Sequence, residues 1–142
     1  MRVMILIKAD KDSEAGNLPS EQLLTDMMAY NEELVNAGIM QGGDGLTPTS
    51  AGARVHFSRD GHQVSKGPFP ELGQLICGFW LWKVDSLDHA IEWVKKCPFP
   101  LEGDGAEIEI RPMFEIEDFG DAATPELRVK NDELRARTEG AA

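Results

Sequence analysis

Two short segments with apolar side chains on both faces constrain the fold of this 142-residue chain most. Side chains of a strand alternate between its two faces, so a strand that is apolar throughout needs cover on both. Residues 2–8 and residues 75–84 both have this pattern. In the first, Val3, Ile5 and Ile7 share one face and Met4 and Leu6 the other. Both segments are therefore predicted to be central strands of a covered sheet.

Two helices are predicted, one after each of these strands. Ser20 is placed to cap the first, which has Leu23, Met27, Tyr30 and Leu34 at helical spacing and ends at Gly38. Ser86 is placed to cap the second, whose apolar face consists of Leu87, Ala90, Ile91 and Val94. Each helix thus has one apolar stripe that can cover a sheet.

The remaining segments complete a strand and helix order. Residues 39–65 are predicted to form a meander or an extended arm, with a hairpin turn at residues 59–61. Residues 107–116 alternate between apolar and charged side chains, which is typical of a half-exposed edge strand. The order strand, helix, strands, helix, strand predicts an α+β fold of ferredoxin-like βαββαβ type, with the first and third strands central and both helices on one face of the sheet.

The second face of this sheet predicts self-association. We expect Met4, Leu6, Trp80 and Trp82 to form an apolar patch on it, on the order of several hundred Å², which soluble monomers rarely expose. A homodimer that closes into an α+β barrel is the simplest cover. The ferredoxin-like domain is predicted to span residues 1–120. Residues 121–142 are expected to add a peripheral helix, capped by Thr124 and running to about Thr138, and a frayed tail.

Charge and composition exclude several classes of protein. The net charge of −11 and the scattered 14 Lys and Arg residues disfavour nucleic acid. Apolar runs far shorter than ~20 residues exclude a membrane span, and residues 1–8 lack the features of a secretion signal. Two cysteines are too few for a disulfide framework and favour the cytoplasm. The three histidines stand apart and the glycines at 42–45 do not open a helix, so no metal and no cofactor are predicted.

The loop at residues 66–71, Lys-Gly-Pro-Phe-Pro-Glu, is followed by a Gly-Phe-Trp strand at 78–80. Here the chain resembles the YCII-related proteins of the DGPF type, in which a Gly-Pro-Phe-x-Glu loop precedes a glycine-aromatic strand. Other matching segments are residues 30–34 (YNEEL), 43–46 (GDGL), 85–87 (DSL), 90–93 (AIEW), 109–112 (EIRP) and 118–120 (DFG). The resemblance implies a dimeric α+β barrel with a pocket near the sheet for a small, often anionic, organic molecule.

The chain departs from the family pattern within the loop. Lys66 stands where the family has Asp before Gly-Pro-Phe, and Gly73 and Gln74 replace the charged residues that usually follow the Glu. Glu71 is the candidate general base, Arg111 the candidate anion clamp, and Lys66 a candidate for stabilising negative charge.

Two functions stay open at this point. One is a lyase-like or isomerase-like reaction on a small carboxylate with Glu71 as base; the other is a non-catalytic module that binds a ligand or a partner. Glu71 and Arg111 are alternatively a structural ion pair with one another or with neighbouring charges. Gly67, Pro68 and Phe69 are expected to shape the ligand-binding loop and to anchor it in the core.

Overall fold

The structure is a computed structural model that describes residues 1–99 and 105–140. It consists of two compact units, Met1–Pro112 and Met113–Ala142. The first holds the sheet, its helices and the loop singled out above. The second is a helical segment and is described separately below.

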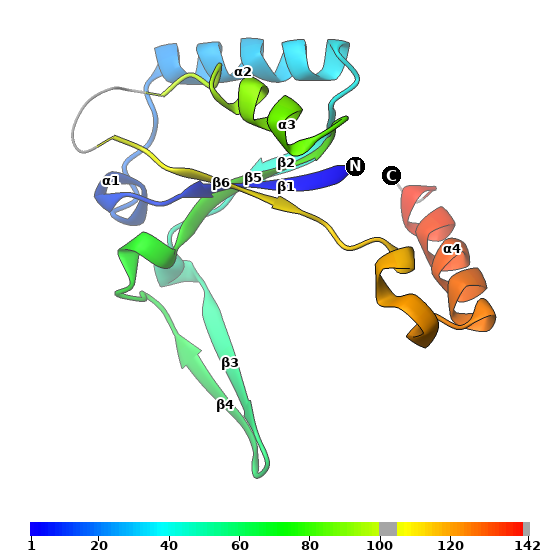
Figure 1. Ribbon diagram of the computed structural model, residues 1–142. Helices are drawn as coiled ribbons and strands as arrows, with labels where there is room; N and C mark the ends of the chain where they lie inside the picture. The colour runs from blue at the N-terminus through cyan, green and yellow to red at the C-terminus, as the bar shows by residue number, and fades with distance from the viewer. Residues whose placement is uncertain (100–104, 141–142) are drawn as a thin grey trace. The chain divides into compact units, whose positions relative to one another are not determined.

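The first unit is built on a four-stranded antiparallel sheet (Figure 1). Its strands are β1 (Arg2–Lys8), β2 (Met40–Gly45), β5 (Ile76–Lys83) and β6 (Ile108–Pro112). They lie in the order β2-β5-β1-β6, so the two strands predicted to be central are central. This confirms the α+β class and the ferredoxin-like order of the elements.

Helices α2 (Glu21–Asn36) and α3 (Leu87–Val94) lie on one side of this sheet (Figure 1). Both predicted N-caps are present: the Ser20 hydroxyl accepts from the amide of Leu23, and the Ser86 hydroxyl from that of His89, each at 3.1 Å. Gly38 follows α2 with a φ of +72°, a left-handed conformation that glycine adopts readily. The local signals that start and stop these helices were therefore interpreted correctly.

The core lies between the sheet and the two helices. It consists of Val3, Ile5, Tyr30, Leu34, Ile39, Trp80, Trp82, Val84 and Ala90. Val3 pairs with Trp82 and Ile5 with Trp80, so both tryptophans share the face that the helices cover. The Trp80 indole donates to Asn31 and the Tyr30 hydroxyl to the carbonyl of Trp93. The prediction that the tryptophans lie beside Met4 and Leu6 was wrong. The register between β1 and β5, which a single sequence leaves open, places the tryptophans on the other face of the sheet.

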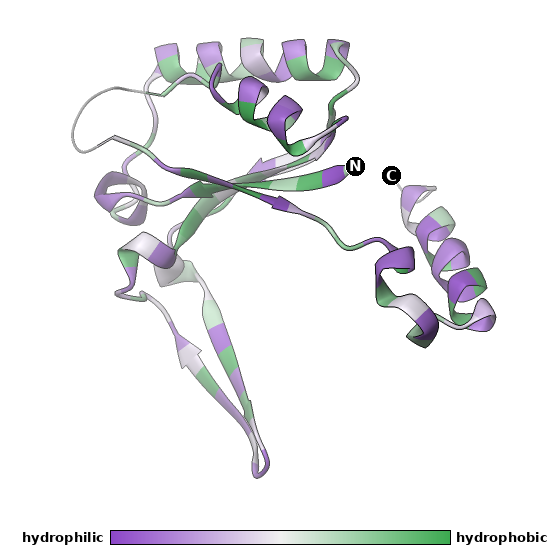
Figure 2. Ribbon diagram, in the orientation of Figure 1, coloured by the Kyte–Doolittle hydropathy of each residue, from purple (hydrophilic) through white to green (hydrophobic). Residues whose placement is uncertain are grey.

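The other face of the sheet carries the second apolar set. Met4 pairs with Leu81 and Leu6 with Phe79, and all four side chains are half-buried. We call these four residues the open sheet face. Neither α2 nor α3 lies on this side of the sheet in Figure 1, and Figure 2 shows apolar colouring along β1 and β5. This face therefore still needs further cover, but Phe79 and Leu81 take the place of the two tryptophans in the predicted set.

A two-stranded hairpin projects from the sheet on the side away from α2 and α3 (Figure 1). It consists of β3 (Ala53–Ser58) and β4 (Gly61–Lys66), and we call it the arm. Three short helices surround its base: α1 (Lys11–Glu14), η1 (Thr49–Ala51) and η2 (Leu72–Gln74). The arm confirms the predicted hairpin and its turn at residues 59–61.

The last strand is shorter than predicted, because β6 ends at Pro112 rather than continuing to residue 116. Proline has no amide hydrogen to continue a ladder, and Ile116–Ala122 forms the 3₁₀ helix η3 instead. Helix α4 (Pro125–Glu139) follows, with the Thr124 hydroxyl accepting from the amide of Leu127 as predicted. Of the predicted frayed tail, residues 141–142 lie outside the described residues. No helix in the described ranges combines the length and apolarity needed to cross a bilayer.

Candidate functional site

The loop at residues 66–71 leaves the arm and leads to η2, and its backbone is hydrogen-bonded to the start of the arm. The amide of Gly67 donates to the carbonyl of Gly52 at 3.0 Å, and the amide of Phe69 donates to the Thr49 hydroxyl at 3.0 Å. A side chain at position 67 would overlap the backbone carbonyl of Thr49. Gly67 is therefore required by close backbone approach, as expected for a loop-shaping residue.

Thr49 joins this loop to the N-terminal part of the chain. Its hydroxyl donates to Oε2 of Glu14 at 2.7 Å, and its amide donates to Oε1 of the same carboxylate at 2.9 Å. Bonds to an ionised acceptor are stronger than neutral ones. Helix α1, helix η1 and the loop are thus held together by one carboxylate and one hydroxyl, which fixes the position of Phe69.

Arg54, in β3, contacts both Phe69 and Glu71. Its guanidinium carbon lies 3.8 Å from the centroid of the Phe69 ring, and its Nη1 lies 3.1 Å from Oε2 of Glu71. A hydrogen bond from the backbone of Glu71 to its own carboxylate, and then the bond from Arg54, lower the pKa of Glu71. Both side chains remain about half exposed, at 48% and 43%. Glu71 is therefore an ionised acceptor that is accessible to solvent.

A hollow of about 400 Å³ adjoins this trio. Most of its wall is apolar, and Arg54 is its cationic residue. The lining residues are Leu46, Thr47, Pro48, Thr49, Gly52, Ala53, Arg54, Phe69, Gln74, Leu75 and Ile76. The volume falls within the range of small-molecule sites, roughly 300–1,000 Å³. An apolar wall with one guanidinium at its edge suits a molecule that has an apolar body and one acidic group.

The predicted site residues divide between two places. Gly67, Pro68, Phe69 and Glu71 lie together at the hollow or beside it, and Lys66 ends β4 next to them. Arg111 lies on β6 opposite Met4, at the open sheet face, with its Nη1 3.3 Å from Oε2 of Glu109. Among the described residues, no hydrogen bond or ion pair connects Arg111 to Glu71.

Arg54 was missed by the sequence reasoning. A signal for it existed, since Arg54 pairs across the predicted hairpin with Ser65, one residue before the loop. A cation at the base of a hairpin that leads into a candidate loop is a reasonable partner for an acid of that loop. The residues that line the hollow from 46 to 53 carried no comparable signal.

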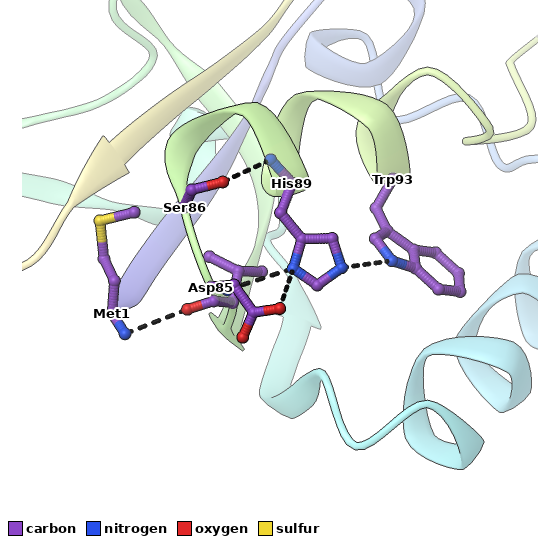
Figure 3. Close-up of polar contacts among 6 residues, drawn as sticks. Met1, Asp85, Ser86, His89 and Trp93 are labelled. Carbon is purple, nitrogen blue, oxygen red and sulfur yellow. Dashed lines mark hydrogen bonds and ion pairs between the residues drawn. The ribbon is translucent and has the colours of Figure 1, made fainter.

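A second hollow, of about 510 Å³, lies at the start of α3 and is lined in part by Met1, Lys83, Asp85 and His89. His89 Nδ1 accepts from the Asp85 amide at 3.1 Å, and its Nε2 is 3.2 Å from the Trp93 indole nitrogen (Figure 3). A neutral imidazole has one acceptor nitrogen, so in a given tautomer only one of these two contacts is a hydrogen bond. The contacts hold the ring against its own helix, which is a structural arrangement. Within residues 1–99 and 105–140, no group of three His, Cys, Asp or Glu side chains is arranged to hold a metal ion.

Comparison with known proteins identifies the family at the level of the YCII-related domain. Residues 1–114 match the model of the YCII-related domain, which covers the sheet, both helices, the arm and the loop. A protein of Rhizobium meliloti (strain 1021), described as uncharacterized, is 30% identical over 93 residues, which are 66% of this chain and 74% of that protein. The chain therefore belongs to the YCII-related domain family.

Proposed function

We propose that this protein binds a small organic carboxylate with an apolar body in the hollow beside the loop. The observation that carries the proposal is the Arg54 guanidinium, stacked on Phe69 at the edge of an apolar hollow. A planar guanidinium pairs with a carboxylate through two parallel hydrogen bonds, and stacking on an aromatic ring holds it in place. The apolar body of the ligand would then lie against Pro48, Leu75 and Ile76.

Glu71 is proposed as the internal competitor of this ligand. Its carboxylate holds Nη1 of Arg54 in the free protein. A ligand carboxylate has to share that guanidinium or displace Glu71 from it. An exposed ion pair contributes only about 0–1 kcal/mol, so displacement is easy. Lys66, at the end of β4, adds a second positive charge next to the loop.

Catalysis by Glu71 as a general base stays a prediction. A base that works near neutral pH usually has a raised pKa, whereas the pKa of Glu71 is lowered. Its present environment therefore favours binding over proton abstraction, and a lyase-like or isomerase-like reaction would need the bound substrate to change that environment. A role of Arg111 as anion clamp likewise stays a prediction.

We further propose that the protein acts as a homodimer through the open sheet face, closing an α+β barrel. Met4, Leu6, Phe79 and Leu81 supply the apolar surface, and Glu109 and Arg111 lie beside them on β6. The loop motif supports assignment to the DGPF-type branch. The two free, half-buried cysteines, Cys77 and Cys97, favour the cytoplasm.

Thermal shift with a matched pair of compounds tests the binding proposal. Benzoate and benzamide have the same shape, and only benzoate is charged. At ten times its Kd, benzoate is expected to raise Tm by roughly 3–6 °C, and benzamide to have little effect at the same concentration. Arg54→Gln should abolish the benzoate shift. Glu71→Gln should increase it, because the internal competitor is gone. Arg59→Gln, at the turn of the arm, is the control and should leave it unchanged.

Equal shifts with benzoate and benzamide, or a full benzoate shift in Arg54→Gln, would refute the assignment of Arg54. Product formation from any carboxylate that binds, followed by NMR, would establish catalysis instead of binding alone. In that case Glu71→Gln should lose turnover while it keeps binding, and unchanged turnover would remove Glu71 as the base.

A further inference from the structure

The arm has one apolar and one polar face, although both are exposed. On one face, Ala53 pairs with Lys66, Val55 with Val64 and Phe57 with His62, so this face is apolar apart from Lys66 at the base and His62 near the tip. Arg54 pairs with Ser65 and His56 with Gln63 on the other face. Val55, Phe57 and Val64 are exposed by 50%, 71% and 60%. If both faces of the hairpin stayed in water, nothing would favour the separation of apolar and polar side chains between them. The apolar face is therefore suited to a contact.

Among the described residues of the first unit, no helix or strand packs extensively on the arm. Beyond their pairing with each other, β3 and β4 make only isolated contacts with other described helices and strands. A lone two-stranded hairpin is marginally stable in water. The arm exposes roughly 200–300 Å² of apolar surface on one face, judged from the size of a buried aromatic side chain. That is a large share of what a soluble monomer usually exposes in one patch.

The position of the arm indicates which molecule provides the contact. The arm leaves the sheet on the side away from α2 and α3, the side of the open sheet face (Figure 1). Any molecule that covers Met4, Leu6, Phe79 and Leu81 therefore approaches alongside the arm. The same molecule can therefore cover both the open sheet face and the apolar face of the arm.

Charge points to the same partner. Residues 53–66 include Arg54, Arg59 and Lys66 and a single acid, Asp60. The formal charge of this segment is therefore +2, and that of the other residues is −13, given −11 for the whole chain. A second copy of the chain offers the arm an acidic surface, and complementary charge favours that encounter.

We propose that the arm of each protomer packs its apolar face, Val55, Phe57 and Val64, on a second copy of this chain, so that two arms clasp the dimer. The proposal rests on the proposed pairing through the open sheet face and adds a second contact to it. With the partner surface included, two arms would bury on the order of 1,000 Å², close to the lower limit for a stable interface. Two-fold symmetry makes this contact occur twice.

Sedimentation equilibrium of two cross-strand double variants tests the proposal. The variant Val55→Ser/Val64→Ser changes the apolar face. The variant His56→Ser/Gln63→Ser changes the polar face at the neighbouring pair and is the matched control. The apolar variant is expected to raise the dimer Kd at least tenfold, since four valines change per dimer. The control should change it less than threefold.

Hydrogen exchange on the unmodified protein covers the case in which the apolar variant loses the arm structure itself. Amides of residues 53–66 should exchange more slowly well above the dimer Kd than well below it. Equal Kd shifts in the two variants, an unchanged Kd in the apolar variant, or exchange that does not depend on concentration would each overturn the proposal. If a labelled oligonucleotide binds the unmodified protein and not the apolar variant, the partner of the arm is nucleic acid and not a second copy of the chain. That result would also overturn the proposal.

The failure of this proposal can be told apart from the failure of the proposed dimer. If the unmodified chain sediments at 15.7 kDa at all concentrations, both proposals fall. If it forms a dimer that neither arm variant weakens, the sheet pairing stands and the clasp is refuted.

Discussion

At the residue scale, the loop depends on a glycine that touches another backbone segment. A Cβ at position 67 would overlap the Thr49 carbonyl oxygen, and it would lie 3.2 Å from the Ser50 nitrogen. These are backbone atoms, so a rotamer change cannot relieve the contact. Gly67→Ala is expected to lower the free energy of unfolding by about 2 kcal/mol or more.

Urea unfolding measures this effect, and Gly73→Ala is the control. Nothing lies within 4 Å of a Cβ built at Gly73, and its φ is not in the left-handed region. That variant should stay within about 0.5 kcal/mol of the parent protein or be slightly more stable. Similar losses in both variants would contradict the close approach at Gly67.

Cys97 makes stability depend on pH at the alkaline end. Burial raises the pKa of its thiol from 9.0 to about 12. The unfolded chain therefore loses this proton at lower pH than the folded chain does. The stabilising contribution is complete below pH 9 and is lost as pH rises from 9 toward 12. Burial, and then the neighbouring Cys97, raise the pKa of Tyr30 as well, which acts in the same direction.

Urea midpoints at pH 8, 9.5 and 10.5 under reducing conditions test this prediction. The midpoint of the parent protein should fall more steeply with pH than that of Cys97→Ala, whose remaining slope reports the other groups. Parallel curves for the two proteins would show that Cys97 does not ionise differently in the folded and unfolded states.

At the scale of elements, local signals predicted the helices and the strand order. Caps and stops depend on neighbouring residues, which explains why Ser20, Ser86 and Thr124 cap the helices they were assigned to. The strand order followed from two segments that are apolar on both faces. The end of β6 was missed because the apolar alternation continues past Pro112, although the ladder does not.

The strand register and the contacts between residues far apart in the chain could not be predicted from the sequence. Which residues of β1 face the tryptophans depends on how β1 pairs with β5, and a shift of one residue exchanges the two faces. In the candidate site, the loop was found from its motif. Its cation, Arg54, lies 17 positions before Glu71 and reaches it only because the arm folds back. The pair Arg111 and Glu109 lies on one strand face, as the period of two implies.

At the scale of the whole molecule, the open sheet face should decide the assembly. Leu6→Asp places a charge in the middle of this face, where a dimer would have to bury it without a partner. The parent protein is expected to sediment as a dimer of twice 15.7 kDa, and Leu6→Asp as a monomer. Leu6 is only half-buried in the single chain, so the variant should remain folded by circular dichroism.

Val129→Asp is the control for this experiment. Val129 is an apolar residue of α4 that is 68% exposed, so it tests whether any added acid disperses this acidic protein. It should leave the dimer intact. Loss of the dimer in both variants would point to general charge repulsion instead of a specific sheet contact.

The arm is closed at its base by the hydrogen bond between Gly67 and Gly52. Its length can therefore be altered at the tip without disturbing the segments that surround the hollow. Because side chains alternate along each strand, trimming or lengthening by two residues on each strand keeps every remaining side chain on its present side. Adding or removing an odd number of residues on one strand would instead move its following side chains to the other face of the hairpin. Protein engineers could thus vary the reach of the hairpin stepwise and use its turn as an insertion point for tags.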